Sequence, residues 1–521
     1  MNHPDKLAMR TTSLADKNFA ALSALFPNAV TEAVDENGTV VRAIDKDVLT
    51  QEINAHIVEG SEERYQFTWP GKRNSILLAN MPIAAVLRPC REESVNFDTT
   101  ENLYIEGDNL DVLKVLRETY LKSVKMIYID PPYNTGNDFV YKDNFAKSAS
   151  EHARQSGGDG NQGSLLGKNF ESSGRFHTAW LNMIYPRLRL ARDLLTDDGV
   201  IFISIGENEI TNMQLLCNEI FGEQNYAATF IWTKTSTPPS LARKCRKTVE
   251  YVLAYEKRWS AQKYFGSFID NGDAPLLNTG NPFKTLTFPK GSVRFGYIEN
   301  GLIAPGKKDR VALEDEINVI DSINANSFRL NGEFKWTQET LNGEVASGTY
   351  FIVKTKKFSI RFQRVGNEGS YKAPTNFINV ELNTESAAGT NESAVKELES
   401  LQLGSYFDYP KPTTLIKALI SMVCNFDKDS LILDFFSGSA TTAHAVMQLN
   451  AEDGGKRKFI MVQLPEVCND RTAAKKAGYS TICDIGKERI RRAGAKIKAD
   501  RALATESLDI GFRVLKLDIH M

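Results

Sequence analysis

The sequence predicts an α/β protein whose doubly wound parallel sheet is interrupted by a β-containing insert. Between about residues 100 and 255, short apolar runs that end in turn signals alternate with segments of helical periodicity. The same alternation returns after residue 405. The stretch between is rich in Gly, Asn and Thr and contains short alternating runs. We therefore expect two halves of one sheet and a separate insert.

The composition is that of an ordinary globular chain. With 521 residues, 42% of them hydrophobic, and a net charge of -2, the chain is long enough for two to four domains. No apolar run reaches the length of a membrane helix, and the N-terminus lacks a secretory pattern. Six scattered cysteines form no zinc or disulfide pattern. These features predict a cytoplasmic protein with no membrane partner and no metal site.

The first half begins with a short strand at 103–105, which leads through Gly107-Asp108-Asn109 into a helical pattern. The next strand, 126–129, stops at Asp130-Pro131-Pro132-Tyr133, because two prolines cannot continue a sheet ladder. The remaining predicted elements are a Ser- and Gly-rich loop at 146–176, a helix at 180–195, a turn at 197–199, a strand at 200–205, a helix at 208–221, and strands at 227–232 and 249–255.

In the second half, Pro412 begins a helix that ends at Cys424. A strand at 431–433 ends in Asp434, and a tight loop then leads into a helix at 440–449. A strand at 459–464 and a basic helix at 485–497 follow. The expected domains are an N-terminal region of unclear role (1–100), the first half (101–258), the insert (259–404), the second half (405–500) and a C-terminal tail (501–521).

Two strand ends carry the predicted chemistry. Ligands of an open parallel sheet bind beyond the carboxyl ends of its strands, so Asp130 and Asp434 can face one site. The loop after Asp434 contains neither a dinucleotide nor a Walker pattern, and one acid with a small-residue turn suits a nucleoside without phosphates. Glu466 is a candidate acceptor for ribose hydroxyls. The alternative for this loop is an ordinary strand-to-helix turn.

Asp130-Pro131-Pro132-Tyr133 suits the activation of an exocyclic amine. Such an amine is a poor nucleophile because its lone pair is delocalised into the ring. The Asp130 carboxylate and the Pro131 carbonyl would accept its two N–H bonds, and the Tyr133 ring would stack on a flipped base. The alternative is a rigid structural turn.

These motifs resemble those of the amino-group DNA methyltransferases that use S-adenosylmethionine (AdoMet). The order of catalytic half, insert and cofactor half is similar to the permuted order of the β class, and the chain resembles most the modification subunits of type III restriction systems. The resemblance implies a Rossmann-like methyltransferase fold and an insert for target recognition. It is carried by residues 107–110, 129–136, 200–205, 459–466 and 485–490.

The resemblance implies adenine N6 as target, AdoMet as cofactor, duplex DNA as substrate, a homodimer, and a separate restriction subunit as a possible partner. Two departures are Ala440, where many relatives have Gly, and Gln463 at the end of its strand. The catalytic residues implied are Asp130, Pro131, Pro132 and Tyr133. The cofactor residues implied are Asp108, Lys411, Asp434, Phe435, Ser437, Gly438, Ser439 and Glu466.

Two basic stretches are candidates for phosphate contacts, although a solvated basic face is the alternative for each. The second interleaves aromatic residues that would support the backbone. The residues are Lys234, Arg243, Lys244, Arg246 and Lys247 in the first stretch, and Lys356, Lys357, Arg361 and Arg364 in the second.

Three other activities remain open from sequence. A protein-glutamine or RNA methyltransferase can share the catalytic motif, but the order of motifs disfavours it. A cytosine N4 methyltransferase is disfavoured by Asp at position 130. An inactive DNA-recognition subunit is disfavoured by the intact motifs.

Overall fold

The computed structural model divides into two compact units. One consists of Met1–Phe265 with Pro374–Met521, and the other of Gly266–Ala373. The predicted loop at 146–176 lies almost wholly outside the described residues. The structure describes residues 14–34, 39–53, 67–136, 139–141, 166–168, 176–238, 240–268, 273–364, 371–379, 387–404, 406–407, 409–500 and 508–519.

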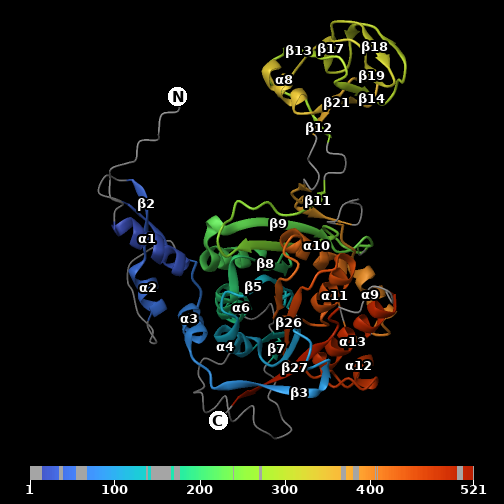
Figure 1. The fold of residues 1–521 in the computed structure, drawn as a ribbon. Coiled ribbons are helices and arrows are strands. Elements are labelled where there is room, and N and C mark those ends of the chain that lie inside the picture. Colours follow the sequence, from blue (N-terminus) through green and yellow to red (C-terminus); the bar gives the residue numbers. More distant parts are fainter. Residues whose placement is uncertain are drawn as a thin grey trace. The chain divides into compact units, whose positions relative to one another are not determined.

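The larger unit is built on a ten-stranded sheet in the order β24-β9-β10-β8-β5-β25-β26-β4-β27-β3 (Figure 1). The six strands from β8 to β27 in this order are parallel, and β10 and β3 run antiparallel to their neighbours. The strands are β3 (Ala85–Val95), β4 (Leu103–Glu106), β5 (Val124–Ile129), β8 (Leu195–Ile205), β9 (Tyr226–Thr233), β10 (Val249–Glu256), β24 (Phe377–Ile378), β25 (Leu431–Asp434), β26 (Lys458–Gln463) and β27 (Phe512–Ile519).

The two halves of the chain meet between β5 and β25. Ile432 pairs with Met126 and Leu433 with Ile127. From this pair the sheet grows in opposite directions, to β8 on one side and to β26 on the other. This is a topological switch point, where the carboxyl ends of the strands form a crevice for ligands. The predicted doubly wound sheet in permuted order is confirmed.

Helices cover both faces of the sheet (Figure 1), because its central strands are apolar on both sides. One apolar cluster joins α3, α4, α6 and α7 to the sheet, and another joins α10, α11 and α13. The helices of the larger unit after residue 70 are α3 (Lys72–Asn80), α4 (Asn109–Tyr120), α6 (Phe176–Leu194), α7 (Ile210–Cys217), η2 (Asn218–Gly222), η3 (Glu223–Asn225), α9 (Asn391–Ser400), α10 (Thr413–Cys424), α11 (Thr441–Asp453), α12 (Ala473–Lys476) and α13 (Ile482–Asp500). The small β6 (Phe139–Tyr141) and β7 (Leu166–Lys168) pair with each other.

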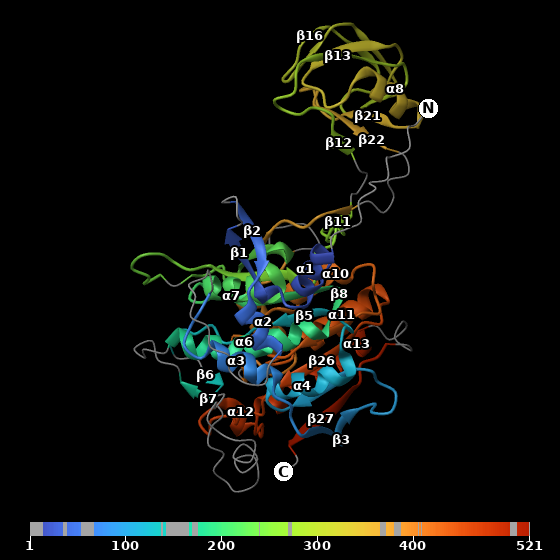
Figure 2. The same ribbon diagram turned by 90° about the vertical axis from the view of Figure 1, so that its left-hand side faces the viewer.

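Several boundaries differ from the prediction. β8 begins at Leu195 and includes the expected turn at 197–199, because pairing with β5 extends the strand. The expected tail contains β27, which pairs with β4 and β3 at the sheet edge (Figure 2). Residues 259–265 and 374–404, which were assigned to the insert, belong to the larger unit, where β24 pairs with β9.

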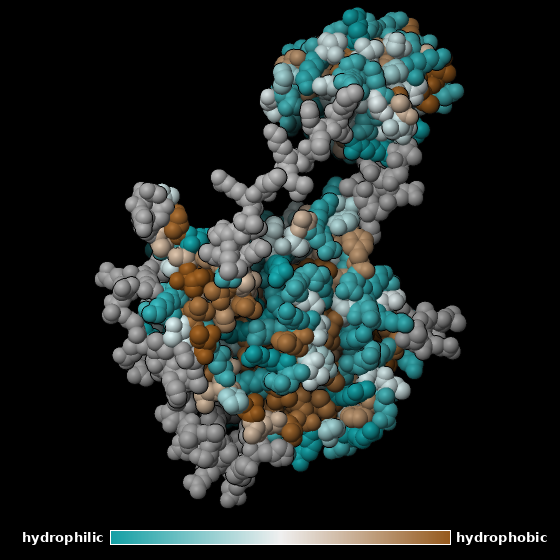
Figure 3. Space-filling model, turned by 60° about the vertical axis from the view of Figure 1, so that its left-hand side comes forward, coloured by the Kyte–Doolittle hydropathy of each residue, from teal (hydrophilic) through white to brown (hydrophobic). Residues whose placement is uncertain are grey.

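The N-terminal region forms a small helical and hairpin layer before it reaches the sheet at β3. Several of its apolar side chains are exposed, among them Leu25, Val40, Val41 and Ile53. Apolar surface gathers in patches on the face drawn in Figure 3. No helix that the structure describes is long and apolar enough to cross a bilayer. The elements are α1 (Leu14–Leu25), η1 (Pro27–Ala29), β1 (Val30–Val34), β2 (Val40–Ile44) and α2 (Lys46–Ile53).

The smaller unit is a β structure with its own apolar core, which includes Phe288, Phe328 and Phe351. A separate core explains why the insert forms a compact unit. Its elements are β11 (Ser267–Phe268), β12 (Asp273–Pro275), β13 (Lys284–Phe288), β14 (Val293–Phe295), β15 (Gly301–Ile303), β16 (Gly306–Lys307), β17 (Val311–Leu313), β18 (Ile317–Ile320), β19 (Ile323–Asn324), β20 (Phe328–Gly332), α8 (Gln338–Ala346), β21 (Tyr350–Val353), β22 (Ile360–Gln363) and β23 (Tyr371–Lys372).

Candidate active site

The predicted catalytic turn follows β5 directly, at the carboxyl end of a strand whose residues are all buried. Pro131 is buried, and Asp130, Pro132 and Tyr133 are half-buried. The indole Nε1 of Trp180, on α6, donates a 2.7 Å hydrogen bond to the carbonyl of Pro132. The turn is therefore held by the fixed φ angles of its prolines and by a tertiary hydrogen bond.

Lys411 joins the two halves of the chain at Asp130. Its Nζ lies 2.9 and 2.8 Å from the two carboxylate oxygens of Asp130. Burial raises the pKa of Asp130, and Lys411 opposes that rise. Burial disfavours the ammonium, but Asp130 and Glu250 outweigh it and raise the pKa of Lys411. The structure thus puts Lys411 on the carboxylate that the sequence predicts to be catalytic, whereas the resemblance assigned it to the cofactor.

A second buried acid, Glu250 on β10, completes this cluster. It accepts 3.1 Å hydrogen bonds from the Tyr133 hydroxyl and from Lys234 Nζ, and one of its oxygens lies 3.6 Å from Lys411 Nζ. Burial disfavours its charge, but Lys411 and Lys234 outweigh burial and lower the pKa of Glu250. Lys234, which the sequence predicted to contact DNA, is therefore engaged by an acid of the site.

Asp434 ends β25, the neighbour of β5, and is buried. Its carboxylate accepts hydrogen bonds from the Phe436 amide at 3.1 Å and from Thr442 Oγ1 at 2.6 Å. Burial raises the pKa of Asp434 to about 7 despite both hydrogen bonds. An acid that titrates near neutrality at a switch point is a candidate ligand for a cationic group.

The loop after Asp434 is tightly constrained and suits a small polar ligand. Gly438 has a φ of +49°, and a Cβ there would lie 3.0 Å from the ring of Phe407. Its N–H donates a 2.7 Å hydrogen bond to Gln463 Oε1. Ala440 has a φ of 61°, a left-handed conformation that glycine adopts without strain. The buried Ser437 hydroxyl has no hydrogen-bond partner among the described residues.

Arg489 of α13 supports this loop from the protein interior. The guanidinium is fully buried and donates hydrogen bonds to Ser439 Oγ at 2.8 Å and to Thr441 Oγ1 at 2.6 Å. Phe435, also predicted in the cofactor loop, is fully buried in the apolar core. Its side chain therefore anchors the loop from within the core.

Asp108 is the N-cap of α4, since its carboxylate accepts a 2.9 Å hydrogen bond from the Leu110 amide. The next residue, Asn109, donates a 2.8 Å hydrogen bond to the Phe435 carbonyl and accepts one of 2.5 Å from Arg187 Nε. The predicted Asp108 segment and the loop after Asp434 are therefore joined. Glu466 is half-buried after β26, and burial raises its pKa.

The first basic stretch lies in the loop between β9 and β10. Arg243, Lys244, Arg246 and Lys247 are all exposed, and Lys247 pairs with Glu207. Exposed cations of this kind remain available to phosphates in solution.

The second basic stretch belongs to the smaller unit and is partly neutralised there. Lys356 and Lys357 are exposed. Arg361 lies 3.1 Å from Asp273, and Arg364 Nε donates a 2.9 Å hydrogen bond to Glu344. Two of the interleaved aromatic residues, Phe351 and Phe358, are buried in the core of this unit, so they do not form an exposed stacking surface.

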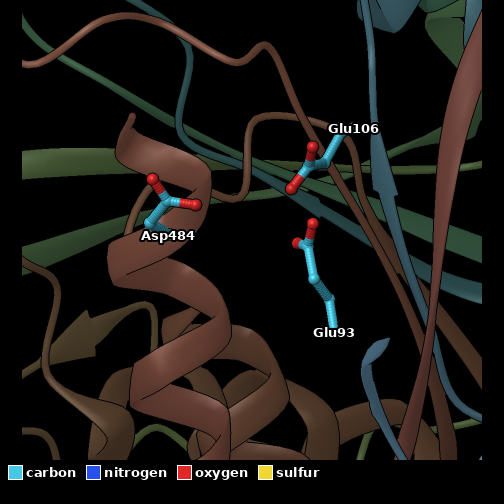
Figure 4. Close-up of side chains that lie close together, drawn as sticks. All are labelled: Glu93, Glu106 and Asp484. Atoms are coloured by element: carbon cyan, nitrogen blue, oxygen red, sulfur yellow. The ribbon is translucent and has the colours of Figure 1, made fainter. Parts of the chain in front are cut away.

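Three further carboxylates, Glu93, Glu106 and Asp484, converge from β3, β4 and α13 (Figure 4). The buried Lys487 pairs with Glu93 and Glu106 and lies 3.4 Å from Asp484. Lys516 of β27 also pairs with Glu93. Two lysines therefore compensate these acids, and the cluster ties the sheet edge to α13.

Among the residues that support the site, Trp180, Arg187, Glu250 and Arg489 were not predicted. The sequence offered a signal for Glu250, because an acid inside an apolar strand needs a partner when it is buried. Arg187 and Arg489 lie on amphipathic helices, where charged residues are expected on the solvent side. Trp180 begins the predicted helix, where a large apolar residue is expected to be part of the core.

Comparisons with known proteins identify the family of this chain. A family model described as "DNA methylase" matches residues 124–493. The EcoPI Mod subunit of a type III restriction-modification enzyme from Escherichia phage P1 is 33% identical over 96% of this chain and 77% of its own length. The StyLTI Mod subunit from Salmonella typhimurium is 33% identical over 88% of this chain and 67% of its own length.

Among solved structures, the cytosine-N4-specific PvuII DNA methyltransferase aligns with a TM-score of 0.34 and 13% identity, over 76% of this chain and 94% of its own. The family match and the Mod relatives each span most of the chain. The chain belongs to the N6/N4 DNA methylase family and is related to the Mod subunits of type III restriction-modification enzymes, so it is a DNA methyltransferase with a Rossmann-like fold.

Proposed function

We propose that this DNA methyltransferase transfers the methyl group of AdoMet to the N6 amino group of adenine at a specific site in duplex DNA. The observation that carries the proposal is the juxtaposition of two strand ends at one switch point. Asp130 follows β5 and Asp434 ends the adjacent β25, although they belong to opposite halves of the chain. Relatives at 33% identity are Mod subunits.

In the proposed mechanism, Asp130 accepts one N–H of the target amine and the Pro131 carbonyl accepts the other. The Pro132 carbonyl accepts the Trp180 indole N–H, and this hydrogen bond holds the turn in place. Lys411 favours the ionised form of Asp130, which is the stronger hydrogen-bond acceptor. When both N–H groups donate hydrogen bonds to these acceptors, the lone pair is localised on the nitrogen, and the nitrogen becomes more nucleophilic.

The proposed AdoMet site is formed by Asp434 and the loop at 435–439, with Asp108 and Glu466 from the neighbouring strand ends. The loop itself supports the assignment, since the buried Ser437 hydroxyl has no hydrogen-bond partner among the residues that the structure describes. Asp434 is suited to the ammonium of the methionine part, and Glu466 to ribose hydroxyls. When bound, AdoMet supplies an electrophilic methyl group.

The compact Gly266–Ala373 unit is the proposed target-recognition region. The exposed lysines and arginines of the two basic stretches, one in each unit, are the proposed phosphate contacts. Removal of 266–373 should abolish site preference, and unchanged preference would contradict the proposed role in target recognition.

We further propose a homodimer, a separate restriction subunit as partner, and the cytoplasm as location.

The test of the catalytic assignment is Asp130→Ala, with Asp98→Ala at an exposed position as matched control. Asp130→Ala should abolish incorporation of labelled methyl groups into duplex DNA and leave AdoMet and DNA binding largely unchanged. Full activity would remove Asp130 from the mechanism.

Long-read sequencing of DNA from a methylation-free host that carries the wild-type gene identifies the modified base. N4-methylcytosine would overturn the adenine assignment, and unmodified DNA would indicate an inactive recognition subunit.

A further inference from the structure

Glu250 is a buried acid that belongs to neither of the two motifs of the proposed site. It lies on β10, where it pairs across the sheet with Trp232 of β9. Burial of a carboxylate is costly unless it is paired and hydrogen-bonded. All of the contacts already described for its oxygens involve residues of the active-site cluster: Tyr133, Lys234 and Lys411.

The contact with Tyr133 fixes the ring that would stack on the target base. The Tyr133 hydroxyl donates to Glu250 Oε2 at 3.1 Å. On another side of the ring, a Cβ at Gly206 would lie only 3.0 Å from Tyr133 Cδ2, so Gly206 permits close approach. The Nζ of Lys411 lies 5.0 Å from the ring centroid. The ring is thus held at its hydroxyl, along its edge and by a cation.

Charge balance explains why an acid suits this position. Asp130 and Glu250 face Lys411 and Lys234, so the cluster contains two negative and two positive groups. A neutral residue at 250 would remove the charged acceptor of the Tyr133 hydroxyl and leave two cations facing one acid. Side chains held in place before the substrate arrives lose less conformational freedom when it binds.

We propose that Glu250 is a positioning residue for methyl transfer, which acts by holding the Tyr133 ring in the orientation that receives the extruded base. Glu250 does not contact the reacting amine in this scheme. The inference rests on the proposed function only in that Tyr133 stacks on the target base.

The test is a double-mutant cycle of Glu250→Gln and Tyr133→Phe, measured as single-turnover methylation of a duplex that contains the target site. Gln has nearly the shape of Glu without its charge, and Phe keeps the ring without the hydroxyl. Each single variant should lose about tenfold to a hundredfold in rate, the range that a hydrogen bond to a charged group represents. The double variant should lose little more than either single variant, because both remove one interaction.

A second measurement reports the base itself. With 2-aminopurine in place of the target base, Glu250→Gln should raise its emission above that of the wild-type complex, because a mobile ring quenches an extruded base less well. The matched control is Glu256→Gln, a buried acid at the other end of β10 that accepts from the Ser260 amide. It should leave rate and emission unchanged. Melting temperature and AdoMet affinity verify that each variant is folded.

Additive losses in the cycle, wild-type rates for Glu250→Gln, or unchanged 2-aminopurine emission would each overturn the proposal. A different result would contradict the proposed function. If sequencing shows that the wild-type enzyme modifies cytosine, the adenine assignment is wrong, and the cycle is then measured on that base.

Discussion

Replacing Lys411 by Met should shift the pH dependence of methylation to higher pH. Lys411 is buried and its Nζ lies 2.9 and 2.8 Å from the oxygens of Asp130, with Glu250 nearby. Burial already raises the pKa of Asp130, and Lys411 is the main group that opposes the rise. Without it, Asp130 is left next to a second acid, Glu250, which raises its pKa further.

The magnitude follows from Coulomb's law. Two unit charges a few ångströms apart near a protein surface interact by about 4 kcal/mol at an effective dielectric constant of 20. At fixed pH this corresponds to about a thousandfold change in the ratio of protonated to ionised Asp130. Protonated Asp130 has lost its negative charge and with it the strength of its hydrogen bond to the amine. We therefore expect a loss of at least about tenfold in rate at neutral pH, with recovery in alkaline buffer.

The assay is a pH–rate profile of single-turnover methylation at saturating AdoMet and DNA. Lys411→Arg is the matched control, since it keeps the charge and should keep the acid limb close to that of the wild type. An unchanged profile for Lys411→Met would refute the reasoning. In a separate assay at subsaturating AdoMet, a defect of Lys411→Met that higher AdoMet concentration corrects, and higher pH does not, would assign Lys411 to the cofactor, as the resemblance implied.

Two other predictions concern the walls of the site. Gly206→Ala puts a Cβ 3.0 Å from the Tyr133 ring, so it should displace the ring and slow methylation. It should also lower the free energy of unfolding, measured in a denaturant titration, by about 1–3 kcal/mol. A wild-type methylation rate would contradict the close contact. Because the folded-state pKa of Asp434 is raised to about 7, the folded chain binds this proton more tightly than the unfolded chain, and this group lowers stability as pH rises from about 4 to about 7. AdoMet affinity, measured by calorimetry, should strengthen as pH rises through about 7 and lose this dependence in Asp434→Asn; an equal dependence in both proteins would exclude Asp434 as the ligand of the ammonium.

Local sequence signals were sufficient for the inner strands of the sheet and for the two strand ends of the proposed site, but not for β3, β24 and β27. The prolines after β5 and the small-residue turn after β25 end buried strands by their own geometry, and both occur where they were predicted. The expected tail at 501–521 was misjudged because a strand such as β27 is stabilised by neighbours, β4 and β3, that are distant in the chain.

The sequence by itself determined the fold class, the family and the two strand ends, because periodicity, prolines and short motifs act over a few residues. Only the tertiary structure decided which charged groups surround Asp130, the proposed catalytic carboxylate. Lys411 reaches Asp130 across 281 positions of sequence, and Glu250 reaches Tyr133 across 117. The protonation state of a buried acid depends on the charges that folding brings within a few ångströms, and no local pattern records those distances.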